Sequence, residues 1–108
     1  FLRDSMAKHE VYIARYYLKR GAYLASSERS KYMLEKYPGA PATEDALIIL
    51  IESYNKLEMI NLAKITADVL TENFSNYSYT LNENKIVLID NTQKDIIEKE
   101  SFFDLGLF

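Results

Sequence analysis

The chain lacks cysteine and has only one histidine (His9), three glycines and two prolines among its 108 residues. Without cysteine it can form no disulfide bond and no thiolate metal site, and it has no thiol nucleophile. A single histidine argues against a zinc cluster or a histidine-based catalytic triad, and we expect His9 on a helix surface. So few turn residues argue against an all-β fold and favour long helices.

Long hydrophobic runs are also lacking. The longest, Ala46 to Ile51, is far shorter than a helix that spans a bilayer. The chain starts at Phe1 and has no signal-peptide pattern, as expected for a processed chain or a fragment. These features therefore leave the cellular compartment open.

No catalytic or cofactor motif is present. The chain contains no glycine-rich phosphate loop, no GxSxG and no HExxH. We interpret Glu44, Asp45 and Glu52 as partners of a helix dipole and a solvated face, not as acid–base groups. We therefore expect no enzyme, no cofactor and no small-molecule substrate, and an enzyme is the least favoured class.

Charge is unevenly distributed. Residues 1–38 carry eight Lys or Arg against four Asp or Glu, whereas residues 39–108 carry five against twelve, for a net charge of −3. The basic first part suits an acidic partner surface. It is too mixed for a nucleic-acid interface, which needs clustered basic residues and a high isoelectric point, so no nucleic-acid partner is expected.

Apolar spacing and helix stop signals predict four helices. The first covers about residues 4–20, the second 23–37, the third begins near Pro41 and the fourth covers about 61–74. The residues expected to face inward are Met6, Ile13, Ala14 and Tyr17 in the first helix, Ser26, Ser30, Met33 and Tyr37 in the second, Leu47, Leu50, Ile51, Tyr54 and Leu57 in the third, and Ala63, Ala67 and Leu70 in the fourth.

The segment after Ser75 differs from the helical part. It is rich in asparagine and contains one β-like run, Ile86 to Ile89. A polar helix candidate follows at Thr92 to Glu100, and the sequence SFFDLGLF comes last. We interpret residues 76–108 as an irregular tail that folds back as a cap, with a short anchor for a partner groove or, ranked last, a membrane surface as the alternative.

The two predicted helix pairs repeat with an offset of 37 residues. The aligned pairs include Tyr17 with Tyr54, Gly21 with Glu58, Ser26 with Ala63, Ser30 with Ala67, and Met33 with Leu70. A tetratricopeptide repeat (TPR) has 34 residues and small residues where its helices cross. Three extra residues fit the loop around Pro38 to Pro41.

We therefore predict an all-α fold of two TPR-like hairpins, at about 4–38 and 41–75, in a body of residues 1–75, followed by the tail. An ordinary antiparallel four-helix bundle is the alternative. Because two repeats seldom make a stable solenoid, we expect the chain to be the end of a longer array.

The stretch from Tyr12 to Phe74 resembles the C-terminal repeats of the BamD family of outer-membrane assembly lipoproteins. The resemblance rests on YYLKRGAY at 16–23, the ER pair at 28–29, LEKYP at 34–38 and PATEDAL at 41–47. The chain departs from the family pattern at Ser26, Ser27 and Ala40. Residues from Asn76 onward have no clear counterpart in the family.

The resemblance implies a non-enzymatic scaffold on the periplasmic face of the outer membrane of a Gram-negative bacterium. Such proteins are held by an N-terminal lipid and help β-barrel proteins to fold and insert, together with other assembly lipoproteins. Their C-terminal repeats dock on the last POTRA domain of the barrel-forming partner BamA. The lipid-bearing cysteine is absent from this sequence. A general TPR adaptor that binds an extended peptide is the alternative function.

The resemblance also implies a partner-binding role for Arg29, because a family arginine at this position pairs with an acidic POTRA residue. A guanidinium can bind a carboxylate through two hydrogen bonds at once. Tyr32 and Lys36 lie on the same helix flank by helical angle, and Tyr23 could extend this surface. The alternatives are an intramolecular ion pair with the neighbours of Glu28 or a solvated flank for Arg29, and a packing role for Tyr23.

Overall fold

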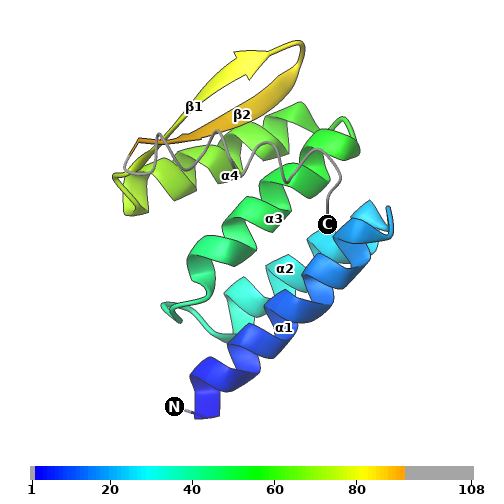
Figure 1. Cartoon of the computed structure of the whole chain (residues 1–108), viewed down its shortest axis with the longest axis vertical. Helices are drawn as coiled ribbons and strands as arrows, with labels where there is room; N and C mark the ends of the chain where they lie inside the picture. The colour runs from blue at the N-terminus through cyan, green and yellow to red at the C-terminus, as the bar shows by residue number, and fades with distance from the viewer. Residues whose placement is uncertain (1, 92–108) are drawn as a thin grey trace.

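In the computed structural model, which describes residues 2–91, four helices precede a small two-stranded antiparallel sheet (Figure 1). The elements are α1 (Leu2–Lys19), α2 (Tyr23–Lys36), α3 (Thr43–Lys56), α4 (Ile60–Asn73), β1 (Tyr77–Asn82) and β2 (Lys85–Asp90). The predicted helices are confirmed to within a few residues. The third begins at Thr43, later than predicted, because Pro41 lies in the turn before it.

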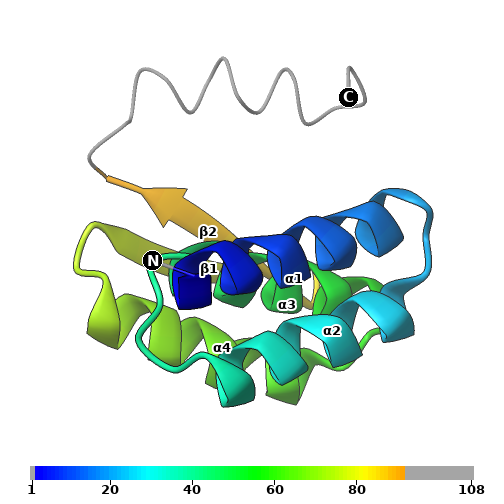
Figure 2. The ribbon, with the colours of Figure 1, turned by 90° about the horizontal axis from the view of Figure 1, so that it is seen from below.

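The helices stack in chain order, since α1 packs on α2, α2 on α3 and α3 on α4. The first and third helices also touch each other. Figure 2 shows α1 and α3 in one layer and α2 and α4 in a second layer.

The turns inside the two helix pairs have the same backbone conformation. Gly21 and Glu58, which the 37-residue offset aligns, have φ values of 79° and 60°. In each turn the next amide donates to the carbonyl five residues before it, at 2.9 Å. This is the Schellman arrangement that ends helices at a left-handed residue. The repeat seen in the sequence therefore extends to local structure, even where glutamate replaces glycine.

Small side chains lie where the helices cross. Ser26, Ser30, Ala63 and Ala67, all predicted to face inward, have no exposed surface. The Ser26 hydroxyl donates to the carbonyl of Ala14 in α1 at 2.9 Å. Such short side chains let the helix backbones approach closely. The buried hydroxyl of Ser26 is satisfied by its bond to the Ala14 carbonyl.

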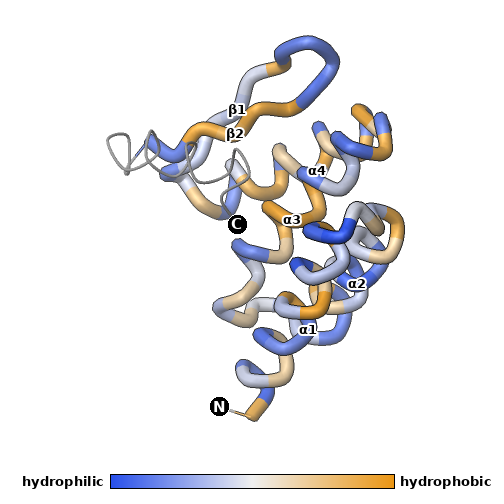
Figure 3. Tube along the Cα trace, turned by 45° about the vertical axis from the view of Figure 1, so that its right-hand side comes forward, coloured by the Kyte–Doolittle hydropathy of each residue, from blue (hydrophilic) through white to orange (hydrophobic). Residues whose placement is uncertain are grey.

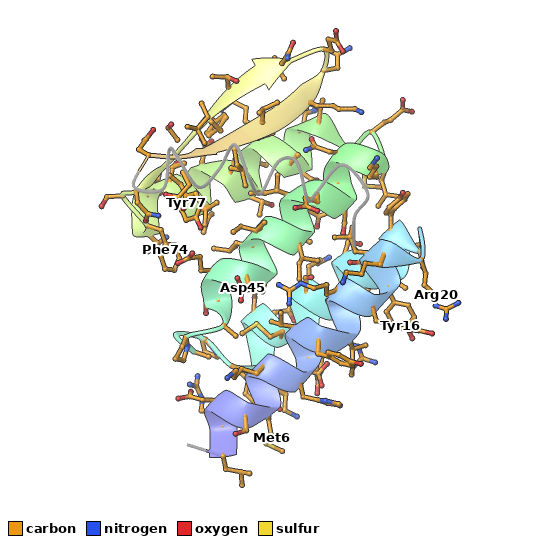
Figure 4. The ribbon with its side chains drawn as sticks, in the orientation of Figure 1. Met6, Tyr16, Arg20, Asp45, Phe74 and Tyr77 are labelled. Atoms are coloured by element: carbon orange, nitrogen blue, oxygen red, sulfur yellow. The ribbon has the colours of Figure 1, made fainter. Side chains whose placement is uncertain are left out.

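The inward face of α1 agrees with the predicted one at Ala14 but not at Met6. Met6 is 49% exposed and lies on the outer side of α1 (Figure 4), whereas Ala7, Val11 and Ala14 are buried. The buried residues follow the spacing i, i+4, i+7 of a helical stripe. Two alanines in this stripe let α1 lie close to its neighbours, which the bulkier methionine would prevent.

The all-α prediction is wrong for residues 77–90, which form a β-hairpin instead of an irregular tail. Its two-residue turn, Glu83 and Asn84, has φ values of 52° and 62° and joins the paired residues Asn82 and Lys85. Two successive positive φ values define a type I′ turn, which matches the natural twist of two paired strands. The predicted β-like run is confirmed, because it lies within β2.

The hairpin packs on α4 and touches α3, and Ile86 is buried among the residues of these helices. Figure 3 shows hydrophobic positions concentrated in α3, α4 and the strands, and a hydrophilic hairpin tip. The hairpin therefore completes the second half of the core. The helix predicted at Thr92 to Glu100 and the sequence SFFDLGLF lie outside the described residues.

Candidate interaction surfaces

Three of the four predicted partner-binding residues lie together on the outer flank of α2. The guanidinium carbon of Arg29 and the ammonium of Lys36 each lie 5.7 Å from the ring centroid of Tyr32. The ring is 41% exposed. A side-chain hydrogen bond with Tyr32 raises the pKa of Lys36 above its usual value. We call Arg29, Tyr32 and Lys36 the α2 flank.

Arg29 also has a partner within the chain. Its Nη1 donates to Oε1 of Glu10 in α1 at 3.0 Å, and the two side chains are 38% and 15% exposed. Arg29 therefore forms an intramolecular ion pair, but its partner lies on α1 and is not one of the neighbours of Glu28 considered above. The pair fixes the direction of the guanidinium and leaves part of it accessible. Sequence reasoning missed Glu10, because nothing in a linear pattern aligns it with a residue 19 positions later.

Tyr23, the fourth predicted residue, is half-buried and lines a groove of about 630 Å³ that none of the α2-flank residues lines. The groove walls come mainly from α1 and α3, with Lys85 contributed by β2. Sequence reasoning did not find this groove, because its residues are scattered between positions 15 and 85. The structure thus divides the four predicted residues between two surfaces.

Another exposed cation lies on an aromatic ring at the end of α1. The Arg20 guanidinium carbon is 4.8 Å from the ring centroid of Tyr16, and Figure 4 shows both side chains pointing away from the helical body. Tyr16 is 47% exposed. Such a cation–π contact holds the exposed guanidinium over the ring.

Polar side chains tie the hairpin to the helices. The Tyr77 hydroxyl donates to Oε2 of Glu44 at 2.6 Å, and the Tyr79 hydroxyl donates to Asp68 of α4. Burial and then Glu44 raise the pKa of Tyr77 well above its usual value. The hydrogen bond from Tyr79 lowers the pKa of Asp68, and Lys64 acts in the same direction. Figure 4 shows Tyr77 near Phe74, where α4 leads into β1.

Within residues 2–91, no three His, Asp or Glu side chains gather where they could hold a metal ion. Nor does any helix of that range combine the length and hydrophobicity needed to cross a bilayer.

Comparison with known proteins identifies the family. The sequence profile of YfiO, described as an outer membrane lipoprotein, matches residues 1–70. The chain belongs to this family. The matched residues include all of the α2 flank and end within α4, so the hairpin lies outside the match.

Curated YfiO-like relatives carry the name outer membrane protein assembly factor BamD. The protein from Neisseria gonorrhoeae is 41% identical over 73 residues, which are 68% of this chain and 27% of that protein. The one from Pasteurella multocida is 38% identical over 68% of the chain and 28% of its own length. The chain thus spans little more than a quarter of these relatives. No solved structure matches the chain significantly.

The family assignment confirms the resemblance inferred from the sequence and places the chain at the outer membrane. The relatives are named as an assembly factor, a name that indicates no catalytic activity. Their organisms are Gram-negative bacteria, as expected for a protein of the outer membrane.

Proposed function

We propose that the chain is a non-enzymatic scaffold segment of the machinery that assembles outer-membrane β-barrel proteins. In this proposal it works on the periplasmic face of the membrane and docks on a POTRA domain of a BamA-like partner. The observation that carries the proposal is the α2 flank, where a partly exposed arginine, an exposed tyrosine and a lysine lie together within the matched part of the chain.

We further propose that the four helices are two TPR-like hairpins, within residues 1–75. The first part of the tail, the β-hairpin, then caps them. The identical turns at Gly21 and Glu58 support the repeat. By the 37-residue offset, α4 corresponds to α2, on which α3 packs. Because the hairpin packs on α4, it takes the place in which a further helix would continue the stack. TPR-like arrays need such an end to their apolar stacking surface.

The geometry of Arg29 is suited to docking. Its guanidinium has five N–H groups in a plane, and the hydrogen bond to Glu10 uses only Nη1. A partner carboxylate can bind the remaining groups while Glu10 holds the side chain in place. Tyr32 adds a large amphipathic contact surface, and aromatic residues and arginine are the types that contribute most to protein interfaces.

The test is a calorimetric titration of the full chain with the isolated POTRA domains of the partner. Arg29→Glu should weaken binding by about 2 kcal/mol or more, roughly 30-fold, because it places a carboxylate against an acidic partner residue. Lys31→Glu makes the same charge change on the exposed opposite side of α2, and it should change the affinity only slightly.

A charge swap separates docking from folding. The double variant Glu10→Arg, Arg29→Glu keeps an ion pair between α1 and α2, so its stability should stay near that of the wild type. Its affinity for the POTRA domains should still fall as in Arg29→Glu. Equal affinity of wild type and charge swap would contradict the role of Arg29, and binding that depends on Tyr23 instead would favour the general peptide adaptor.

A further inference from the structure

The groove between α1 and α3 is a second surface, separate from the α2 flank. Residues of α1 form one wall, residues of α3 form the other, and Tyr23 and Lys85 come from α2 and β2. Its volume of about 630 Å³ falls within the range of sites that hold a small ligand or a few side chains of a peptide. No residue of the α2 flank lines it, so its role can be tested independently.

The groove is basic although the chain is acidic. Four of its lining residues are cations, namely Arg15, Lys19, Lys56 and Lys85, and one, Glu52, is an anion. All four cations are exposed. This local excess of positive charge contrasts with the net charge of −3 for the whole chain. The field at the groove therefore attracts anionic groups.

The floor of the groove is apolar. Leu18 and Ile48 are half-buried and Ile49 is 3% exposed, and all three line the groove. An occupant that only neutralised the cations would leave the exposed parts of Leu18 and Ile48 facing water. An occupant with an apolar side chain between carboxylates would cover both, and burial of apolar surface would add to the affinity.

We propose that this groove binds an acidic segment of a partner protein, one that inserts apolar side chains between its carboxylates. A nucleic acid fits less well, because Tyr23 is the single aromatic residue of the lining whereas stacking on successive bases needs several, and because the chain is acidic as a whole. This inference goes beyond the proposed POTRA docking, since it concerns a different surface and a different binding chemistry.

The probe is a short fluorescent peptide in which leucines alternate with pairs of glutamates. Its binding to the full chain is followed by fluorescence anisotropy. Arg15→Glu combined with Lys56→Glu should weaken binding about tenfold or more, because the groove then repels the carboxylates. The matched control combines Lys8→Glu with Lys31→Glu, two exposed cations outside the groove, and should stay within about twofold of the wild type.

Two further measurements test the chemistry. Replacing the glutamates of the peptide by lysines should abolish binding. Ile48→Ala should weaken binding without any change in charge, because it removes part of the floor. Equal affinities for the groove and control variants, or binding of the lysine peptide, would overturn the proposal. Because neither double variant changes the α2 flank, failure here and failure of POTRA docking remain distinguishable.

The other conceivable occupant is the last segment of the chain itself, which carries Glu98, Glu100 and Asp104. A full-length variant with lysine at these three positions addresses it. Unchanged peptide affinity in this variant supports a partner protein as the occupant. An affinity gain of several-fold would assign the groove to the chain's own segment and overturn the proposal.

Discussion

The side-chain amide of Asn55 pairs with both backbone groups of Ile86. Its Nδ2 donates to the Ile86 carbonyl at 2.9 Å, and its Oδ1 accepts the Ile86 N–H at 3.0 Å. A two-stranded sheet has an outer edge on each strand, where backbone groups lack a strand partner. Here the Asn55 amide, at the end of α3, forms the two hydrogen bonds that a neighbouring strand would form. It does so at Ile86, the one buried position of β2.

Asn55→Leu should therefore destabilise the protein by about 1–3 kcal/mol, because it leaves two partly buried backbone groups without hydrogen bonds. The measurement is urea unfolding followed by circular dichroism. The control is Asn61→Leu, at an exposed position of α4, which should change stability by less than about 0.5 kcal/mol. Equal effects of the two substitutions would show that the pairing with Ile86 contributes nothing.

Glu58→Gly should stabilise the protein by about 1 kcal/mol. Glu58 has a φ of 60°, a conformation that costs side-chain-bearing residues energy and glycine almost none. Glu28→Gly, at an exposed position inside α2, is the matched control and should destabilise by about 1 kcal/mol, because glycine disfavours helix interiors. Thermal unfolding of both variants gives the sign of each change, and a loss of stability in Glu58→Gly would contradict the strain.

Ala67→Leu should destabilise by about 1–3 kcal/mol through overpacking, because Ala67 is fully buried where α3 and α4 meet. Glu72→Leu adds a leucine to the exposed side of the same helix and should have little effect. Urea midpoints of the two variants provide the comparison. A neutral result for Ala67→Leu would mean that the helices are not in close contact there.

Stability should decrease above about pH 10 as the hairpin tyrosines ionise. Burial and Glu44 raise the pKa of Tyr77 in the folded state, and Asp68 raises that of Tyr79. A tyrosine in the unfolded chain has a pKa near 10. Because the pKa is higher in the folded state, the stabilising contribution is complete below pH 10 and is lost as the pH rises through the folded-state pKa.

The combined variant Tyr77→Phe, Tyr79→Phe should show a smaller loss of stability in this alkaline range, measured by urea unfolding at a series of pH values. Tyr12→Phe is the control, since Tyr12 is 68% exposed and should leave the alkaline profile unchanged. An alkaline loss that is identical in all three proteins would exclude the hairpin phenols as its source.

The helical part of the fold follows from local patterns, which is why it could be predicted. Pro38 and Gly39 end one helix, and the small residues at positions 26, 30, 63 and 67 recur with a constant offset. The hairpin was missed because Glu83–Asn84 is not among the strongest turn dipeptides and Asn-rich sequences resemble loops. Its strands are stabilised by contacts with α3 and α4, which no local pattern contains.

The candidate surfaces could be predicted only in part. Arg29, Tyr32 and Lys36 follow helical spacing, so their grouping was visible in the sequence. Tyr23 belongs to another face, and the cations around it come from elements far apart in the chain. Such a cluster results from the stacking of α1 on α3, a tertiary contact that a single sequence does not encode in any local signal.

The position of the hairpin determines which end of the helix stack should open first. Stacked units lose their ends first, because an end has a neighbour on one side only. The hairpin covers α4, whereas Leu2, Met6 and Tyr12 of α1 project outward without a neighbouring element among residues 2–91. In the isolated chain, amide protons should therefore exchange with solvent sooner in α1 than in α4, and opening should spread from the N-terminal helix towards the sheet.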